Sequence, residues 1–104
     1  MHPLNSLILE LRKFRDERGW RKYHTLKNLA ISISIEAAEL LEIFQWRDDE
    51  EEIIKREKNR LEDEIADIFI YLLFFCDTAK IDLLEVSKKK LEVIKKKYPV
   101  GYHP

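Results

Sequence analysis

Two pairs of acidic residues have the spacing of neighbouring ligands on a helix. Glu36 and Glu39 lie three residues apart, and so do Glu64 and Asp67. Side chains three residues apart emerge on nearly the same line of an α-helix, so each pair would present two carboxylates side by side. Carboxylate oxygens are the ligands that hard divalent cations such as Mg²⁺ and Mn²⁺ prefer. The spacing makes these four acids candidate metal ligands.

The apolar pattern around the four acids indicates that they are not simply solvated. Each pair falls between two apolar faces of its helix rather than opposite them, and Tyr71 follows the second pair along the same strip. Burying an uncompensated carboxylate is costly, and like charges nearby raise the cost, whereas a bound cation offsets both. No histidine stands three residues after any of these acids, so the Glu-x-x-His pairs of di-iron bundles are missing and Mg²⁺ is favoured.

A solvated surface is the competing interpretation of these acids. The chain has 20 acidic residues among 104, so a single Glu-x-x-Glu pair would carry little weight. Two such pairs on consecutive helices, each flanked by apolar stripes, favour a shared ligand set. The prediction requires that the two helices lie side by side with both pairs facing one pocket.

Length and composition predict one all-α domain covering residues 1–104. Hydrophobic residues make up 45% of the chain, enough for a core. There are only two glycines, and the three prolines lie near the ends, so the interior contains almost no helix breakers. Helical periodicity predicts four helices, over residues 4–18, from about 25 or 28 to 46, over 50–78, and from 83 to 97 after a cap at Asp82.

Four helices with short loops predict an antiparallel four-helix bundle. The second and third helices are apolar on two sides, which is more than one small bundle can cover. Self-association of the chain is the simplest way to cover the second apolar faces.

Charge and cysteine content exclude several classes of function. The formal net charge is −1, which provides no broad positive field for DNA or RNA, so we expect no nucleic-acid partner. Cys76 is the only cysteine, so no disulfide can form within the chain, and we assign it to the core. No signal peptide or membrane span is visible, and we expect a cytoplasmic protein with no membrane partner.

The acidic motifs, taken with their neighbours, resemble those of a known family. They are similar to the MazG-like all-α nucleoside triphosphate pyrophosphohydrolases, and most similar to the single-domain dCTP pyrophosphatase branch. The resemblance covers nearly the whole chain. It is carried by these residues: Glu36, Glu39, Glu42, Phe44, Gln45, Trp46, Asp63, Glu64, Asp67 and Tyr71, with Arg18, Trp20, His24, Lys27, Asn28, Leu29, Tyr98 and Pro99.

The resemblance implies an enzyme that converts a nucleoside triphosphate, with dCTP-like substrates as candidates, to the monophosphate and pyrophosphate in nucleotide-pool house-cleaning. Glu36, Glu39, Glu64 and Asp67 would hold Mg²⁺, with Mn²⁺ as a substitute, in a bundle that works as a homodimer or dimer of dimers. We expect Glu39, or else Glu36, to act as the general base. Ile94 is a departure, because relatives often have asparagine there.

Six further residues are candidates for substrate binding. Flat rings can stack on a base, a histidine can donate or accept a hydrogen bond, and lysines can contact phosphates. Ordinary packing of the aromatics and solvation of the lysines are the alternatives. The candidates are Trp20, His24, Lys27, Trp46, Tyr71 and Lys90.

Two other functions remain open. A phosphoribosyl-ATP pyrophosphohydrolase would carry similar acidic motifs, although Trp20 and the Gln45-Trp46 pair argue against it. A non-catalytic helical oligomerisation module would use the acids only in salt bridges with the lysines. Only a metal-binding protein should gain thermal stability from Mg²⁺.

Overall fold

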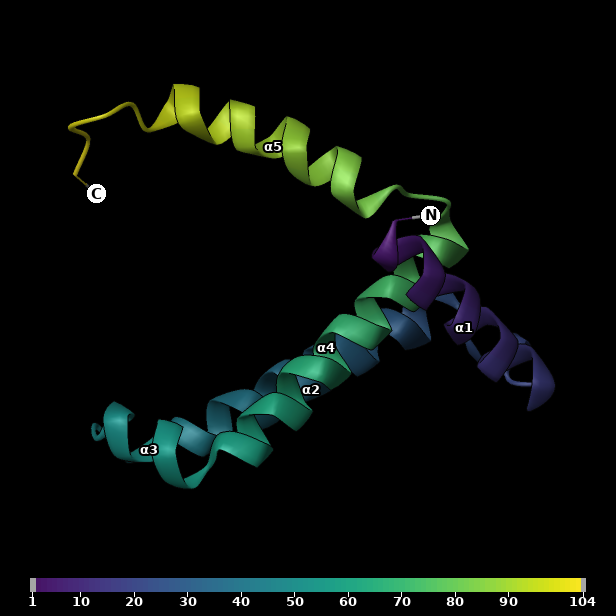
Figure 1. Ribbon diagram of the computed structural model, residues 1–104, viewed down its shortest axis with the longest axis horizontal. Helices are drawn as coiled ribbons and strands as arrows, with labels where there is room; N and C mark the ends of the chain where they lie inside the picture. Colours follow the sequence, from purple (N-terminus) through teal and green to yellow (C-terminus); the bar gives the residue numbers. More distant parts are fainter. Residues whose placement is uncertain (1, 104) are drawn as a thin grey trace.

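The computed structural model describes residues 2–103, which form five α-helices, one short 3-10 helix and no strand. The elements in chain order are α1 (Pro3–Glu17), η1 (Arg21–Tyr23), α2 (Leu26–Phe44), α3 (Glu50–Arg56), α4 (Lys58–Ala79) and α5 (Leu83–Lys97). Figure 1 shows α2 and α4 side by side and antiparallel, with α1 against one end of the pair and α3 at the other. The predicted all-α class is confirmed. None of the described helices combines the length and apolar character that a bilayer crossing would require.

The helix ends follow from local side-chain chemistry. The Thr25 hydroxyl accepts a hydrogen bond from the Asn28 N–H at 3.1 Å, and an Asp82 carboxylate oxygen accepts one from the Glu85 N–H at 3.0 Å. Both side chains satisfy N–H groups that a helix start leaves without an intrahelical partner. Gly19, with φ +66°, ends the α1 region in the left-handed conformation that glycine adopts at little steric cost.

The predicted continuous helix over residues 50–78 is wrong in one respect. The chain leaves helical geometry at Glu57, with φ −110° and ψ 19°, and this divides the segment into α3 and α4. Ile53 on α3 is 0% exposed. A straight extension of α4 would carry that side chain past the end of α2, so the break allows α3 to bury it against the α2–α4 pair.

A closed four-helix bundle is not formed within residues 2–103. Helix α5 extends away from the α2–α4 pair as a separate arm (Figure 1), and none of its residues is buried. The radius of gyration is 16.9 Å, whereas a compact chain of this length has one of about 13 Å. The buried apolar residues therefore lie along the α2–α4 pair and where α3 packs at its end, at Leu29, Ile43, Ile53, Leu73, Phe74 and Cys76. The prediction of Cys76 as a core residue is confirmed.

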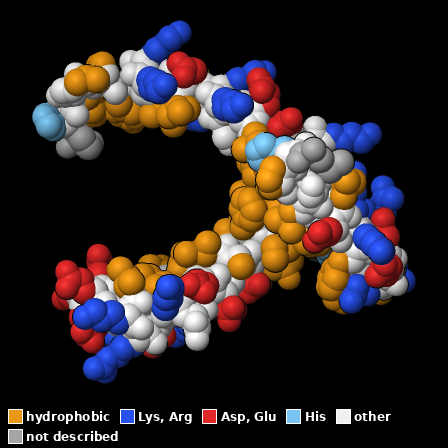
Figure 2. Space-filling view, viewed as in Figure 1, with side chains coloured by type: hydrophobic (Ala, Val, Ile, Leu, Met, Phe, Trp, Pro, Cys, Tyr) orange, Lys and Arg blue, Asp and Glu red, His pale blue; other side chains and the backbone are white. Residues whose placement is uncertain are grey.

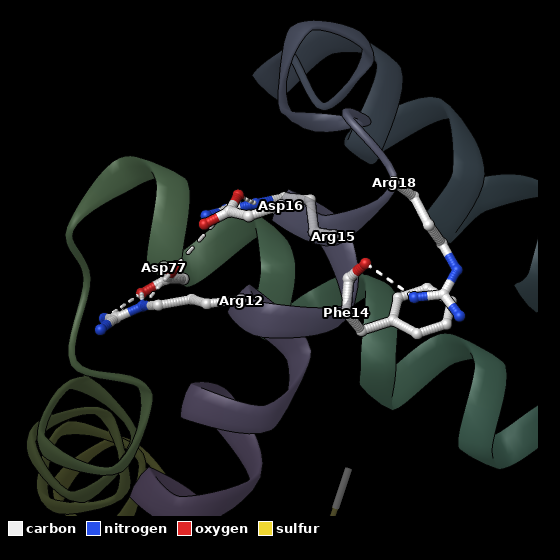
Figure 3. Close-up of polar contacts among 6 residues, drawn as sticks. All are labelled: Arg12, Phe14, Arg15, Asp16, Arg18 and Asp77. Atoms are coloured by element: carbon white, nitrogen blue, oxygen red, sulfur yellow. Dashed lines mark hydrogen bonds and ion pairs between the residues drawn. The ribbon is translucent and has the colours of Figure 1, made fainter.

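Arginines of α1 fasten that helix to the end of α4. Arg12 Nε donates to both carboxylate oxygens of Asp77, at 2.9 and 3.0 Å, as Figure 3 shows. Arg15 is only 5% exposed, and its guanidinium lies 2.9 Å from Asp16 and 3.7 Å from Asp77. A buried guanidinium needs such partners because an unpaired buried charge is strongly destabilising. Asp77 is therefore the residue that joins α1 to α4.

We expect Asp77→Asn to lower the free energy of unfolding by about 3 kcal/mol, because buried Arg15 and bidentate Arg12 both lose their shared carboxylate. In a chain of this size that loss lowers the melting temperature by more than about 10 °C. Thermal unfolding followed by circular dichroism measures the change. Glu10→Gln, on an exposed position of α1, is the matched control and should leave the melting temperature unchanged. Equal melting temperatures for the two variants would contradict the assignment.

Candidate metal and active site

The antiparallel packing of α2 and α4 brings acids from both predicted pairs together. Glu36 on α2 and Glu64 and Asp67 on α4 each offer a carboxylate oxygen, and these oxygens lie within 4.8 Å of one another. Glu39 lies beside them, because its side chain contributes to the electrostatic environment of both Glu36 and Glu64. The two pairs therefore face one shared site, which is the arrangement that the metal-ligand prediction requires.

The site holds carboxylate oxygens whose hydrogen-bonding capacity is unused. Glu36 and Glu64 are half-buried, and the Oε2 atom of each is inaccessible to solvent and has no hydrogen-bond partner among the described residues. Buried polar atoms are almost always paired, so two such atoms side by side call for a partner. Asp67 is exposed and opens the site to solvent.

Electrostatic repulsion is visible in the proton affinities of the glutamates. Desolvation, followed by the nearby Glu39, Glu64 and Asp67 side chains, raises the pKa of Glu36 to about 7. Desolvation and the Glu39 side chain also raise the pKa of Glu64. No lysine or arginine in residues 2–103 forms an ion pair with Glu36, Glu64 or Asp67; Arg60 instead lies near Glu42 and Glu57. The cluster lacks a positive charge.

These features fit a hard divalent cation. The oxygens come from two packed helices, lie within 4.8 Å of one another, and have free lone pairs that a cation can fill. A bound cation would also oppose the desolvation and the repulsion that together raise the pKa of Glu36. The carboxylates that would hold it are Glu36, Glu64 and Asp67, with Glu39 adjacent.

Tyr71 is the one substrate-binding candidate that the fold places on the same helix face as the carboxylates. It follows Asp67 by one turn and Glu64 by two, and it is half-buried. Trp46 lies beyond the C-terminal end of α2, ten residues or about 15 Å along that helix direction from Glu36. The Trp46 side chain is 93% exposed on a backbone with φ 65°.

His24 and Trp20 lie toward the opposite end of the α2–α4 pair. The His24 ring packs edge-on against Phe74, with centroids 4.6 Å apart, and its Nδ1 atom is buried without a hydrogen-bond partner among the described residues. Phe74 is two turns beyond Asp67, about 10 Å along α4. The Trp20 ring contacts Phe14 edge-on at 5.4 Å.

The two candidate lysines are also apart from the carboxylates within one chain. Lys27 is exposed in the first turn of α2, nine residues or about 13 Å before Glu36. Lys90 is exposed on the α5 arm. The single chain therefore assembles the four acids and Tyr71, but it does not bring Trp20, His24, Lys27, Trp46 or Lys90 to them.

The sequence analysis did not predict a basic groove near His24. A hollow of about 470 Å³ is lined by Arg12, Arg15, Arg21, His24 and Lys80, together with Asp16, Asp77 and Thr78. Burial and the positive charge of Arg15 lower the pKa of His24. Two sequence features could have indicated this groove: the three-residue spacing of Arg12 and Arg15, and the position of Asp77 directly after an apolar run.

The pKa of Glu36 gives the metal-free protein a defined pH dependence. Because the folded-state pKa, about 7, exceeds the ordinary 4.5, the unfolded chain releases this proton first, and the free energy of unfolding falls as pH rises from about 4.5 to 7. After allowance for partial solvent exposure we expect a loss of about 1 kcal/mol. Glu36→Gln should flatten this fall, as measured by urea unfolding with EDTA at several pH values. Glu62→Gln is the exposed control, and an unchanged slope in Glu36→Gln would refute the pKa assignment.

Comparisons with known proteins agree with this geometry. The MazG-like family model matches residues 31–103, which include all four acids. The dCTP pyrophosphatase 1 of Bos taurus is 35% identical over 92 residues, or 85% of this chain and 54% of that protein. The Homo sapiens dCTP pyrophosphatase 1 is 32% identical over 91 residues, or 84% of this chain and 54% of that protein. The chain thus spans about half the length of these curated relatives.

A solved structure is similar over nearly the full length. The crystal structure of a pyrophosphatase from Archaeoglobus fulgidus DSM 4304 superposes with a TM-score of 0.92 at 56% sequence identity. The match covers 95% of this chain and 94% of that one. Together with the family match across the carboxylate helices, this likeness shows that the chain belongs to the MazG-like family.

Proposed function

We propose that the protein is a Mg²⁺-dependent nucleoside triphosphate pyrophosphohydrolase, for which Mn²⁺ can substitute. It releases pyrophosphate and a nucleoside monophosphate, and dCTP-like compounds are the first substrates to test. The observation that carries the proposal is the convergence of Glu36, Glu64 and Asp67 with buried, unpartnered oxygens. Support comes from relatives named dCTP pyrophosphatase 1 and from the similar pyrophosphatase of Archaeoglobus fulgidus.

The reaction requires the protein mainly to compensate the charge of the triphosphate and to position it. A triphosphate carries three to four negative charges, and it cannot approach four carboxylates without compensating positive charge. Bound Mg²⁺ would supply that charge and polarise the phosphates. Glu36, Glu39, Glu64 and Asp67 would hold it, and the rigid α2–α4 pair would fix where the triphosphate lies.

The proton transfer is assigned to a glutamate of the same cluster. Glu39 would accept a proton from a water molecule whose oxygen attacks the α-phosphorus in line, while the bond from that phosphorus to the bridging oxygen breaks and pyrophosphate leaves. Glu36 is the second candidate, because a pKa near 7 lets it exchange a proton around neutral pH. The assignments of Glu39 and Glu36 as candidate general bases are both part of the proposed function.

Base recognition would fall to Trp20, Trp46, Tyr71 and His24, and phosphate contacts to Lys27 and Lys90. These groups do not converge within one chain, which supports a homodimer or a dimer of dimers as the working form. A second copy would bring basic side chains and further aromatic side chains to carboxylates that have only Tyr71 beside them within one chain. The exposed apolar helix faces are a further argument for self-association.

Product analysis tests the reaction. With Mg²⁺ and a panel of canonical and modified triphosphates, we expect pyrophosphate and the monophosphate as products. Glu39→Gln and Asp67→Asn should each lower turnover at least about 100-fold while the protein stays folded, because charge at the site is lost. Glu62→Gln, an exposed acid of α4 outside the cluster, should keep full activity. Release of single phosphate in place of pyrophosphate would refute attack at the α-phosphorus.

Metal binding is tested separately by thermal stability, since a ligand of the folded state alone raises the melting temperature. At a Mg²⁺ concentration ten times its Kd, we expect a gain of about 1.4 kcal/mol, or a rise of at least about 5 °C. EDTA should reverse the rise, and Asp67→Asn should abolish it. An equal rise in Asp67→Asn, or no rise in the unaltered protein, would favour a non-catalytic helical module.

A further inference from the structure

The proposed function uses only His24 among the residues that line the basic groove. The groove lies at the end of the α2–α4 pair where α1 packs. Figure 2 shows basic side chains gathered with acidic ones over this α1 end of the molecule. Asp77, the first α4 residue of the lining, is ten residues or about 15 Å along α4 from Asp67. The groove is therefore separate in space from the carboxylate cluster.

Positive charge exceeds negative charge in the lining of the groove. Four cationic side chains and two carboxylates line it, so its formal charge is +2 when His24 is neutral. The guanidinium groups of Arg12 and Arg15 are engaged with carboxylates. The other two cationic side chains, Arg21 and Lys80, are exposed and form no ion pair within residues 2–103. The uncompensated charge of the groove therefore resides on Arg21 and Lys80.

The buried Arg15 guanidinium retains donors that its own chain does not use. The only hydrogen bond that it donates within residues 2–103 runs from Nε to Asp16, at 2.9 Å. Its Nη1 atom lies 3.7 Å from Asp77, which is too far for a hydrogen bond. Neither Nη atom is fully buried, so both can be reached from the groove that Arg15 lines. Such a fork of N–H donors suits two oxygens of a phosphate.

The His24 imidazole is a second group in the lining with unused hydrogen-bonding capacity. Its Nδ1 atom is buried without a partner among the described residues, and Phe74 holds the ring edge-on. Burial and, after it, the positive charge of Arg15 lower the pKa of His24. An anion in the groove would offset the Arg15 charge and favour the protonated imidazole. His24 therefore reports whether the groove is occupied.

A phosphate group suits this arrangement better than other small ligands. The excess of positive charge disfavours a cation. The donors come from different elements, because Arg15 belongs to α1, Arg21 to η1 and Lys80 to the end of α4. A planar carboxylate accepts hydrogen bonds mainly in one plane, whereas the tetrahedral oxygens of a phosphate accept them from several directions. The groove volume of about 470 Å³ leaves room for a small group attached to the phosphate.

We propose that the groove binds a phosphate group, carried by a free phosphate or pyrophosphate ion or by a small molecule such as a nucleoside monophosphate. The Arg15 guanidinium donates to the phosphate oxygens from inside the groove, and Arg21 and Lys80 compensate the charge from its rim. No metal is needed, because the protein supplies the cations. The inference does not depend on the proposed function, which places the triphosphate at the carboxylates.

NMR of the histidine rings tests the groove without metal or turnover. The protein is first freed of metal, and chloride replaces phosphate at constant ionic strength in the reference samples. Without metal the carboxylates repel phosphate, so they do not compete for it. We expect phosphate to raise the pKa of His24, because the bound anion offsets the Arg15 charge. The ring signals of His2 and His103 are internal controls. A His24 pKa that is the same with and without phosphate would overturn the proposal.

A pair of double variants tests which cations hold the phosphate. Arg21→Gln with Lys80→Gln removes the charge excess of the groove and leaves buried Arg15 and its partners in place. We expect the phosphate dissociation constant, measured from the His24 signal, to rise at least about tenfold, because two charge-assisted contacts are lost. Lys55→Gln with Lys89→Gln makes the same change in net charge at exposed positions elsewhere and should alter the constant less than about twofold. Equal weakening in both double variants would contradict a localised site.

Three further titrations distinguish the sources of the phosphate group. Pyrophosphate that binds more tightly than dCMP would identify a free ion as the ligand, and the reverse order would identify a nucleotide. Deoxycytidine, which has no phosphate, should leave the His24 signal unchanged. An equal response of His24 to deoxycytidine and dCMP would show that the groove recognises the nucleoside, and the phosphate proposal would be wrong. None of these measurements requires pyrophosphohydrolase activity, so its absence would bear on the proposed function alone.

Discussion

Like-charged carboxylates are held close together between two packed helices, and the surrounding structure has to resist their repulsion. Glu36, Glu64 and Asp67 approach within 4.8 Å, and burial keeps water from solvating one oxygen of each glutamate. The unbound chain therefore gives up stability at this point, as the pKa of Glu36 near 7 shows. Leu29 and Ile43 on α2 and the buried Ile53 on α3 pack on either side of this level and oppose the separation of α2 and α4. A cation bound between these carboxylates would restore the stability that their repulsion costs.

The two ends of the α2–α4 pair are closed by different means. At one end, α3 packs on the pair and buries Ile53, so this end is closed by an apolar contact. At the other, Asp77 joins Arg12 and Arg15 of α1, and burial together with the Arg15 charge lowers the pKa of the neighbouring His24. The same ionic joint lies one turn before the connection to α5. The C-terminal end of α4 therefore fixes the positions of both α1, which packs against it, and α5, which extends away from it.

Local and periodic features were predictable from the sequence, whereas long-range ones were not. Four of the five α-helices, the cap at Asp82 and the side-by-side placement of the two acids within each pair follow from spacing and capping chemistry. The meeting of the two pairs depends in addition on the packing of α2 against α4. The break at Glu57 was missed because residues 50–78 contain no proline or glycine, and only the burial of Ile53 against other helices explains it. The direction of α5 was not predicted, because an apolar stripe shows that a helix needs a packing partner but does not show whether that partner belongs to the same chain. Arg15 was missed because its burial depends on a partner 62 positions away, at Asp77.

Trp46 combines two properties that each cost stability. A large side chain in the left-handed backbone region is disfavoured by about 1–2 kcal/mol, and an indole that is 93% exposed recovers none of this through packing. A glycine or asparagine would suit the same turn with less steric conflict. The turn nevertheless presents one of the two indole rings of the protein almost entirely to solvent. Nearly all of that ring's apolar surface is left for another surface to bury, and only such burial could offset the cost of the turn.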